Sequence, residues 1–110
     1  MWNEPTKEKL AKLLPAIGST DGPTTKDKMV RAHLFIGGCD WYLTEYDPED
    51  DLAFGFACLN GDLQNAEWGY ISIAELRDLK FGFVEIDFDL HWRPRPAGEI
   101  ALIVKAGGVW

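Results

Sequence analysis

Apolar and polar residues alternate along three neighbouring segments, which predicts three consecutive β-strands. These segments are residues 29–36, 41–46 and 52–59. Gly37-Gly38 is a two-residue turn signal between the first two, and the acidic run 47–51, with its proline, is typical of a turn between the second and third. The pattern therefore predicts an antiparallel meander.

The faces of these strands follow from the alternation. In the first strand one face carries Val30, Ala32, Leu34 and Ile36, and the other carries Met29, Arg31, His33 and Phe35. In the second strand Trp41, Leu43 and Glu45 are expected opposite Tyr42, Thr44 and Tyr46. In the third strand Leu52, Phe54, Phe56 and Cys58 share one face, and Ala53, Gly55 and Ala57 share the other. A helix can lie closely against that face of small residues.

Two short helices flank the predicted sheet. Leucines at helical spacing predict a helix over about residues 5–14, which Pro15 and Gly18 end. Residues 67–71 read as a fourth strand, and Ser72 with Glu75 matches the capping box of a helix that reaches about Leu79.

The remaining segments are less regular. Residues 81–90 alternate as a strand, with Phe83 breaking the pattern on the acidic face. Residues 17–27 read as a flexible loop and 93–98 as an extended, proline-rich connection. Residues 100–104 are apolar throughout, which fits either a buried strand or an apolar helical turn. The whole chain, 1–110, is expected to form a single α+β domain with a mostly antiparallel sheet of four to six strands and two short helices.

Charge is unevenly distributed along the chain, whose formal net charge is −7. Residues 40–90 hold 13 acidic side chains against two basic ones. Phosphate contacts dominate nucleic-acid affinity, so direct binding of DNA or RNA is not expected. The same charge is attracted to a basic protein surface, although acidity also serves solubility alone.

The chain carries no apolar run long enough for a membrane helix and no signal-peptide pattern at its start, so a cytoplasmic location is expected. The two cysteines, Cys39 and Cys58, fit a reducing compartment as free thiols. Cys58 falls on the apolar face of its strand and is expected in the core, whereas Cys39 falls in a loop, where it can be exposed.

Two acidic groups are candidates for function. The first is the strand face of Glu85, Asp87, Asp89 and His91, where successive side chains are spaced about 6.6–6.8 Å apart. That spacing is too wide for one compact metal site, and a solvated strand face explains the pattern equally well. The second is the turn of Asp47, Glu49, Asp50 and Asp51, which lacks the calcium-loop pattern. The turn and Glu85, Asp87 and Asp89 are predicted to contact a protein partner, with no catalytic residue, cofactor or metal ligand assigned.

Aromatic residues are abundant, and most must pack in the core. One or two left exposed among acidic side chains would anchor a protein partner. Trp2 and Trp110, near the two ends, can either be pinned to the body or join such a patch. No nucleotide-binding loop, serine-nucleophile motif or zinc-type cysteine spacing occurs in the sequence.

Three segments together resemble a known family. They are Trp41-Tyr42-Leu43-Thr44-Glu45, Phe54-Gly55, and the run from Glu67 through Trp68-Gly69-Tyr70-Ile71-Ser72 to Leu76. In this order they are similar to domain-of-unknown-function family 2958, found in bacteria on plasmids and other mobile elements. The resemblance covers roughly residues 10–90, with Ile73 in place of the family's usual leucine.

The resemblance implies no established activity and no catalytic residue. The mobile-element setting, and the link of some relatives to inhibition of CRISPR nucleases, imply a counter-defence role. The protein is therefore expected to be a small acidic binding module, not an enzyme. It would bind a host nuclease by contacting a basic surface of that nuclease. The alternatives are a divalent-metal-dependent enzyme using Glu85, Asp87, Asp89 and His91, or a non-inhibitory subunit of plasmid maintenance.

Overall fold

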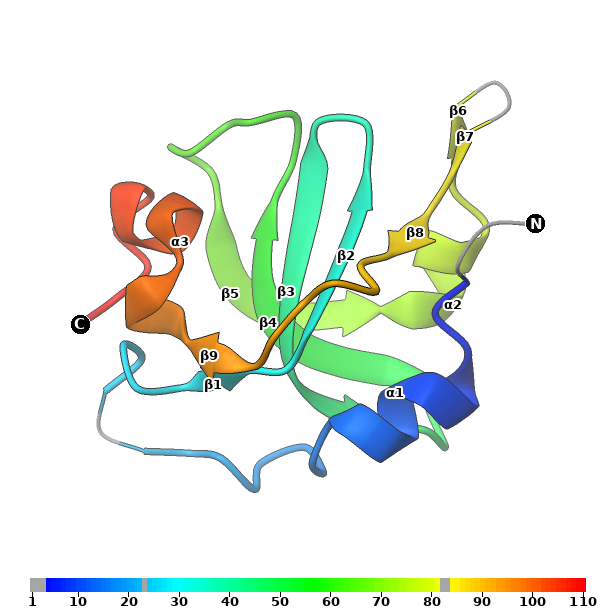
Figure 1. The fold of residues 1–110 in the computed structure, drawn as a ribbon, viewed down its shortest axis with the longest axis horizontal. Coiled ribbons are helices and arrows are strands. Elements are labelled where there is room, and N and C mark those ends of the chain that lie inside the picture. Colours follow the sequence, from blue (N-terminus) through cyan, green and yellow to red (C-terminus); the bar gives the residue numbers. More distant parts are fainter. Residues whose placement is uncertain (1–3, 23, 82–83) are drawn as a thin grey trace.

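A five-stranded antiparallel sheet forms the centre of the protein, in the strand order β5-β4-β3-β2-β8 (Figure 1). The computed structural model describes residues 4–22, 24–81 and 84–110. The elements in chain order are α1 (Lys7–Leu13), β1 (Met29–Val30), β2 (Ala32–Ile36), β3 (Cys39–Asp47), β4 (Leu52–Cys58), β5 (Glu67–Ser72), α2 (Ile73–Arg77), β6 (Lys80–Phe81), β7 (Val84–Glu85), β8 (Asp87–Phe88), β9 (Arg95–Pro96), the 3-10 helix η1 (Ala97–Glu99) and α3 (Ala101–Lys105). The predicted α+β class with a mostly antiparallel sheet is confirmed, with α3 as a third helix.

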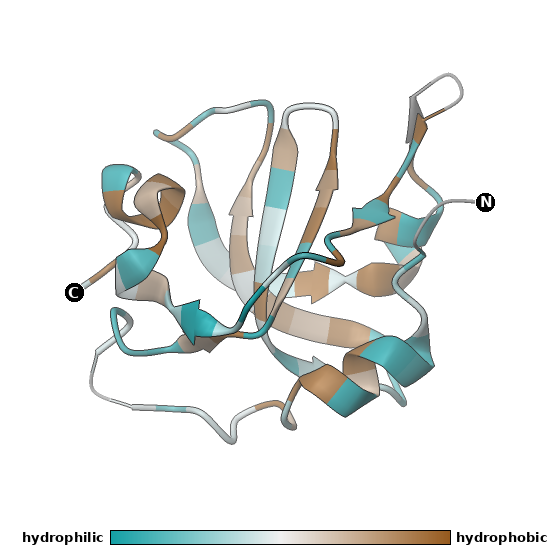
Figure 2. Ribbon diagram, in the orientation of Figure 1, coloured by the Kyte–Doolittle hydropathy of each residue, from teal (hydrophilic) through white to brown (hydrophobic). Residues whose placement is uncertain are grey.

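Both faces of the sheet are covered, so the protein has two hydrophobic clusters. One face packs against α1 and α2 and includes Leu10, Leu14, Leu34, Trp41, Leu43, Ala53, Ile73 and Leu76. The other packs against α3 and includes Val30, Tyr42, Phe56, Ala97, Ile100 and Ile103. The prediction that a helix lies against the small residues of β4 is confirmed at Ala53. Figure 2 shows the resulting alternation along the strands, and the loop between α1 and β1 in mostly pale and hydrophilic colours.

The predicted meander is confirmed and continues into β5. Ile36 pairs with Cys39 across the Gly37-Gly38 turn, and Gly37 takes the positive φ of 55° that such a turn favours. β4 pairs with β5 along its length, from Leu52 opposite Ser72 to Ala57 opposite Glu67. The two predicted helix starts are also correct, since the Thr6 and Ser72 side chains accept hydrogen bonds from the amides of Lys9 and Glu75.

A β-bulge at Thr44 makes the predicted faces of β3 wrong beyond Leu43. The register of β3 against β4 shifts between Leu43 and Glu45, so Thr44 is the extra residue. Its hydroxyl donates to the carbonyl oxygen of Phe54 at 3.1 Å. Tyr46 consequently packs in the same cluster as Trp41 and Leu43, and not on the face of Tyr42. A bulge of one residue reverses every side chain that follows it.

The predicted strand over residues 81–90 is divided into short pieces. β6 pairs with β7, and β8 pairs with β2 through Phe88 opposite Leu34 and Asp87 opposite Phe35. The chain therefore reverses within the predicted strand, because Lys80 and Phe81 pair antiparallel with Glu85 and Val84. The interpretation of Phe83, like that of Trp2, lies outside the described residues.

The C-terminal part folds back along β1. β9 pairs with β1, so the predicted connection 93–98 contains a short strand and the start of η1. Of the two alternatives for residues 100–104, the helix is correct. The loop 17–27 is tied to this end of the chain, since Thr25 hydrogen bonds with the main chain of Gly108 and Trp110. No helix in the described ranges is long and apolar enough to cross a membrane.

Candidate functional site

The acidic turn between β3 and β4 presents carboxylates on an ordered backbone. Pro48, Glu49 and Asp50 are exposed and Asp47 is half-buried. The carboxylate of Asp47 accepts a hydrogen bond from the amide of Glu49 at 2.9 Å, which closes a local turn. The side chains of Glu49 and Asp50 are thus held out into solvent at the end of the hairpin.

Asp51, the last residue of the turn, is placed differently from its neighbours. It is only 7% exposed and binds two side chains of the interior. The hydroxyl of Tyr46 donates to Asp51 Oδ1 at 2.5 Å, and Arg77 of α2 donates to both carboxylate oxygens. Arg77 also donates from Nε to the carbonyl oxygen of Pro5 at 2.9 Å, so the guanidinium connects the turn, α2 and the segment before α1. Asp51 is therefore an internal anchor and is unavailable as a partner contact.

Electrostatics favour this anchor at neutral pH. Burial alone would raise the pKa of Asp51, but hydrogen bonds from Arg77 and Tyr46 outweigh it and hold the pKa below its usual value. Burial, reinforced by the hydrogen bond to Asp51, raises the pKa of Tyr46 to about 12. The carboxylate and the neutral phenol are thus both stabilised in the folded protein.

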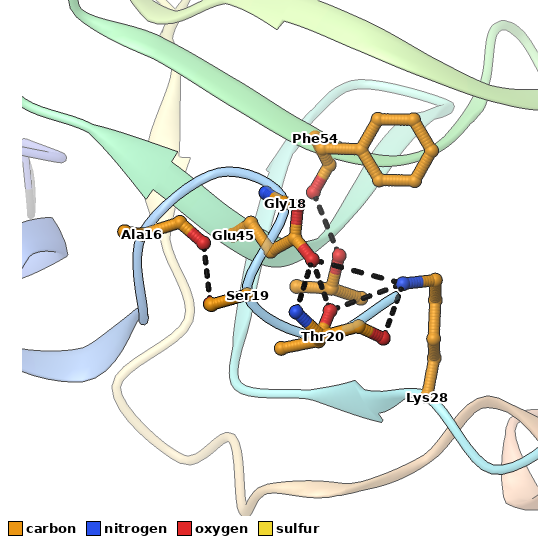
Figure 3. Close-up of polar contacts among 8 residues, drawn as sticks. Ala16, Gly18, Ser19, Thr20, Lys28, Glu45 and Phe54 are labelled. Carbon is orange, nitrogen blue, oxygen red and sulfur yellow. Dashed lines mark hydrogen bonds and ion pairs between the residues drawn. The ribbon is translucent and has the colours of Figure 1, made fainter. Parts of the chain in front are cut away.

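Glu45 of β3 forms a second internal anchor, which holds the loop between α1 and β1 (Figure 3). It is 2% exposed. Its carboxylate accepts hydrogen bonds from the amides of Gly18 at 2.8 Å and Thr20 at 3.0 Å, and from the Thr20 hydroxyl. Lys28 Nζ lies 3.7 Å from the same carboxylate and donates to the Thr20 carbonyl oxygen. Burial would raise the pKa of Glu45, but these hydrogen bonds and the lysine charge hold it below its usual value.

This anchor explains why an acidic residue lies in the middle of β3. The role of Glu45 could not be predicted from sequence, because its partners lie more than 15 residues away in a loop without regular pattern. The nearby pocket, about 300 Å³ in volume, includes Thr20 and Lys28 in its lining. Both residues are already bound to Glu45 or to each other, so they contribute to the structure of the loop.

The predicted strand face of Glu85, Asp87, Asp89 and His91 does not assemble as one group. Among residues 4–22, 24–81 and 84–110, no group of three His, Cys, Asp or Glu side chains is arranged so that it could hold a metal ion. Asp89 is bound to His33, and His91 is exposed. Asp87 is half-buried, and its Oδ1 is buried without a hydrogen-bond partner among the described residues. The metal-dependent alternative thus has no supporting geometry in this part of the chain.

His33 lies between two carboxylates that sequence reasoning did not connect. Its Nε2 is 2.7 Å from Asp40 Oδ1 and its Nδ1 is 2.9 Å from Asp89 Oδ2. The protonated ring can donate to both carboxylates at once. Burial would raise the pKa of Asp89, but the hydrogen bond from His33 holds it below its usual value. With both nitrogens occupied, the ring has no free atom to act as a general base.

The hairpin register contains the signal for part of this cluster. The Gly37-Gly38 turn places Tyr42 opposite His33 and Asp40 opposite Phe35, so Asp40 is a diagonal neighbour of His33. The ring of His33 stacks on Tyr42 at 4.7 Å between centroids. Trp92 packs against both rings and donates from its indole to the carbonyl oxygen of Val30 at 3.0 Å. Through Asp89 and Trp92, the cluster holds the segment after β8 against His33 and Val30.

Both cysteines lie in the interior as free thiols. Cys58 is in the core as predicted, and burial, followed by the charge of Asp40, raises the pKa of its thiol. The suggestion that Cys39 is exposed is wrong, because the residue begins β3 and is only 6% exposed. Neither thiol is placed for nucleophilic chemistry.

One aromatic group lies open to solvent near the edge of the sheet. Tyr70 of β5 is 66% exposed and packs edge-on against the half-buried Phe54 at 5.4 Å between centroids. Trp110 is also exposed, but its main chain is bound to Thr25. Trp68, two residues before Tyr70 in β5, is half-buried and donates from its indole to the carbonyl oxygen of Gly108 at 2.7 Å. Tyr70 is thus an exposed aromatic residue that shares its strand with an exposed carboxylate, that of Glu67.

Comparison with known proteins gives a family and no function. The model of the family described as "Protein of unknown function (DUF2958)" matches residues 6–101. No curated protein and no solved structure matches the chain. The residues that carry the resemblance have structural roles here: Thr44 forms the bulge, Glu45 anchors the loop, and Ser72 caps α2.

Proposed function

Because this chain belongs to the DUF2958 family of proteins of unknown function, we propose a function from its own surface: it is a small acidic module that binds a protein partner. In the more specific form of the proposal, the partner is a CRISPR nuclease of the host and the module is a counter-defence inhibitor. The mobile-element setting implied by the family resemblance motivates this choice of partner.

The observation that carries the proposal is the rigid presentation of the acidic turn. Asp47, Glu49 and Asp50 extend from a hairpin whose last residue, Asp51, is bound internally by Arg77 and Tyr46. A surface that is already ordered loses little conformational entropy when it binds. Complementary charge would steer it to a basic groove, such as one that holds nucleic acid.

The contact set is smaller than the one expected from sequence. Asp51 is internal, and Asp89 is occupied by His33. We therefore assign the partner contact to the acidic turn, Asp47, Glu49 and Asp50, and leave out Glu85 and Asp87, which lie apart from the turn on β7 and β8.

The test is target-DNA cleavage by a panel of purified single-effector CRISPR nucleases, with and without excess protein. The triple variant Asp47→Lys, Glu49→Lys, Asp50→Lys should weaken inhibition at least about tenfold and reduce its dependence on salt. The matched control, Glu8→Lys, Asp21→Lys, Glu99→Lys, makes the same change in net charge at exposed positions elsewhere and should retain inhibition.

Order of addition then identifies the step. Inhibition that requires addition before guide or target DNA indicates competition for the nucleic-acid groove. Absence of both inhibition and binding across the panel would reject the nuclease as partner. Equal loss in the two triple variants would reject the turn as the contact.

A further inference from the structure

β5 forms an end of the five-stranded sheet, and within the described ranges no strand pairs with its outer edge. Proteins usually protect such edges with a bulge, a proline, a short strand or several charges. β5 has six residues, Glu67–Ser72, no proline, and Glu67 as its one charged residue. No register shift interrupts its pairing with β4. The edge is long and regular enough to accept another strand.

The hydrogen-bond pattern shows which main-chain groups point outward. The carbonyl of Leu43 accepts from the amide of Arg31 at 2.9 Å, so it points away from β4. Leu43 and Gly55 are therefore a non-hydrogen-bonded pair, which means that the N–H and C=O of Gly55 point towards β5. Gly55 and Gly69 consequently form a hydrogen-bonded pair. The bond from the amide of Ile73 to the carbonyl of Asp51 at 3.0 Å continues the same alternation. The N–H and C=O of Tyr70 consequently point outward from the sheet.

The surroundings of Tyr70 are open and acidic. A Cβ added at Gly69 would meet no atom within 4 Å. Glu67 on β5 and Glu75 in the first turn of α2 are both exposed. The nearby cations Lys28 and Arg77 are bound to Glu45 and Asp51, so they do not neutralise this edge.

We propose that the outer edge of β5 around Tyr70 pairs with an extended, basic segment of the protein partner, by addition of a strand to the sheet. This inference rests on the proposed protein-binding function and gives the partner's chemistry. Main-chain bonds to Tyr70 supply affinity, and lysine or arginine side chains on the added strand meet Glu67 and Glu75. A second copy of this chain fits less well, because each copy carries a net charge of −7.

The first test is amide hydrogen exchange of the intact protein with an eleven-residue peptide that alternates lysine with valine and threonine. With the peptide at ten times its Kd, exchange at the Tyr70 amide should slow about tenfold. The amides of Gly69 and Ile71 already bond to β4 and serve as internal references. A peptide with glutamate in place of lysine should give no protection.

The second test separates the main chain from the aromatic ring. Tyr70→Pro removes the outward N–H without breaking a bond to β4, and proline is tolerated at such edge positions. It should weaken peptide binding at least about tenfold, whereas Tyr70→Thr, which keeps the N–H, should weaken it less. Circular dichroism checks that Tyr70→Pro is folded, and the exchange measurement on the unaltered protein decides the question if it is not.

Three outcomes overturn the inference. It fails if the basic peptide leaves the exchange rate of the Tyr70 amide unchanged, or if the acidic peptide binds equally well. It also fails if the protein sediments as a dimer whose Tyr70 amide is already protected without peptide. Nuclease binding that is insensitive to Tyr70→Pro, together with no effect of the peptide, would reject the edge and leave the proposed function intact. Protection of Tyr70 by the peptide without binding to any nuclease would reject the nuclease partner and leave the edge intact.

Discussion

Arg77 of α2 binds Asp51 of the β3–β4 turn through two hydrogen bonds. These bonds join the tip of the β3–β4 hairpin to α2, from which it is separated in sequence by β5. Arg77 Nε reaches further, to the carbonyl oxygen of Pro5. One side chain thus fixes the acidic turn relative to both helices on that face of the sheet.

Replacing Arg77 with alanine should therefore destabilise the protein. The substitution leaves the carboxylate of Asp51 buried without its cation, and loss of one partner of a buried pair costs about 3 kcal/mol. Urea unfolding followed by tryptophan fluorescence measures the change. Lys12→Ala, at an exposed position of α1, is the control and should change stability by less than about 0.5 kcal/mol. A similar small change for Arg77→Ala would show that the ion pair does not hold the turn.

Gly55 should not tolerate a side chain. A Cβ at this position would lie 2.1 Å from the carbonyl oxygen of Tyr42 and 3.0 Å from Leu43 Cα. These are backbone atoms beside the bulge at Thr44, so the strands must move apart, and we expect Gly55→Ala to cost about 2–3 kcal/mol. Thermal and urea unfolding measure the loss.

Gly69, opposite Gly55 in the next strand, provides the matched control. Its added Cβ would meet nothing within 4 Å, and alanine reduces the entropy of the unfolded chain. Gly69→Ala should leave stability unchanged or raise it by up to about 1 kcal/mol. Equal losses at the two glycines would contradict the close approach of β3 and β4 at Gly55.

Local patterns in the sequence were sufficient for most of the sheet and for the helix starts. Alternation and the Gly37-Gly38 turn gave β2 and β3, and Ser72 with Glu75 gave the start of α2, because each depends on residues a few positions apart. The faces of β3 beyond Leu43 could not be predicted, because the bulge depends on the space that Gly55 leaves in a different strand.

The candidate site was predictable only in part. The composition of the turn indicated exposed carboxylates, and Glu49 and Asp50 are placed accordingly, whereas Asp47 is half-buried. The inward position of Asp51 depends on Arg77, which is 26 residues away, and the position of Asp89 depends on His33, 56 residues away. A count of acidic residues cannot separate those that bind internally from those left for a partner.

Substitution of Glu45 with glutamine should loosen the loop before β1 selectively. The change replaces a carboxylate that accepts three hydrogen bonds with an amide, and bonds to a charged group contribute about 1.5–3 kcal/mol each. We expect the amides of Gly18 and Thr20 to exchange faster while those of β4 keep their protection. Hydrogen–deuterium exchange with mass spectrometry measures this, and Glu49→Gln, at an exposed position, should leave the loop unchanged.

The same substitution should alter the response to acid. The folded-state pKa of Glu45 is lower than its ordinary value of 4.5, so its contribution to stability is present above that value and is lost as pH falls through the folded pKa. Glu45→Gln should thus be less stable than the unaltered protein at pH 7, and the difference should shrink as the pH falls below 4.5 and through the lowered folded-state pKa. A difference in stability that does not vary with pH would contradict the role of the charged carboxylate.

Alkaline titration should show two tyrosines that ionise late. Burial raises the pKa of Tyr42 and Tyr46 to about 12, from an ordinary value of 10.0. Because the folded-state pKa is raised, the stability that each neutral phenol contributes is complete below pH 10 and is lost as pH rises from 10 towards 12. Absorbance at about 295 nm, the phenolate band, should register two late ionisations that coincide with unfolding.

Tyr46→Phe should remove one of these two late ionisations. It should also lower the free energy of unfolding by about 1 kcal/mol at pH 7, because the hydrogen bond to Asp51 is lost. If Tyr46→Phe leaves the late ionisations unchanged in number, Tyr46 is not the neutral donor that Asp51 requires, and the anchor of the acidic turn would rest on Arg77 alone.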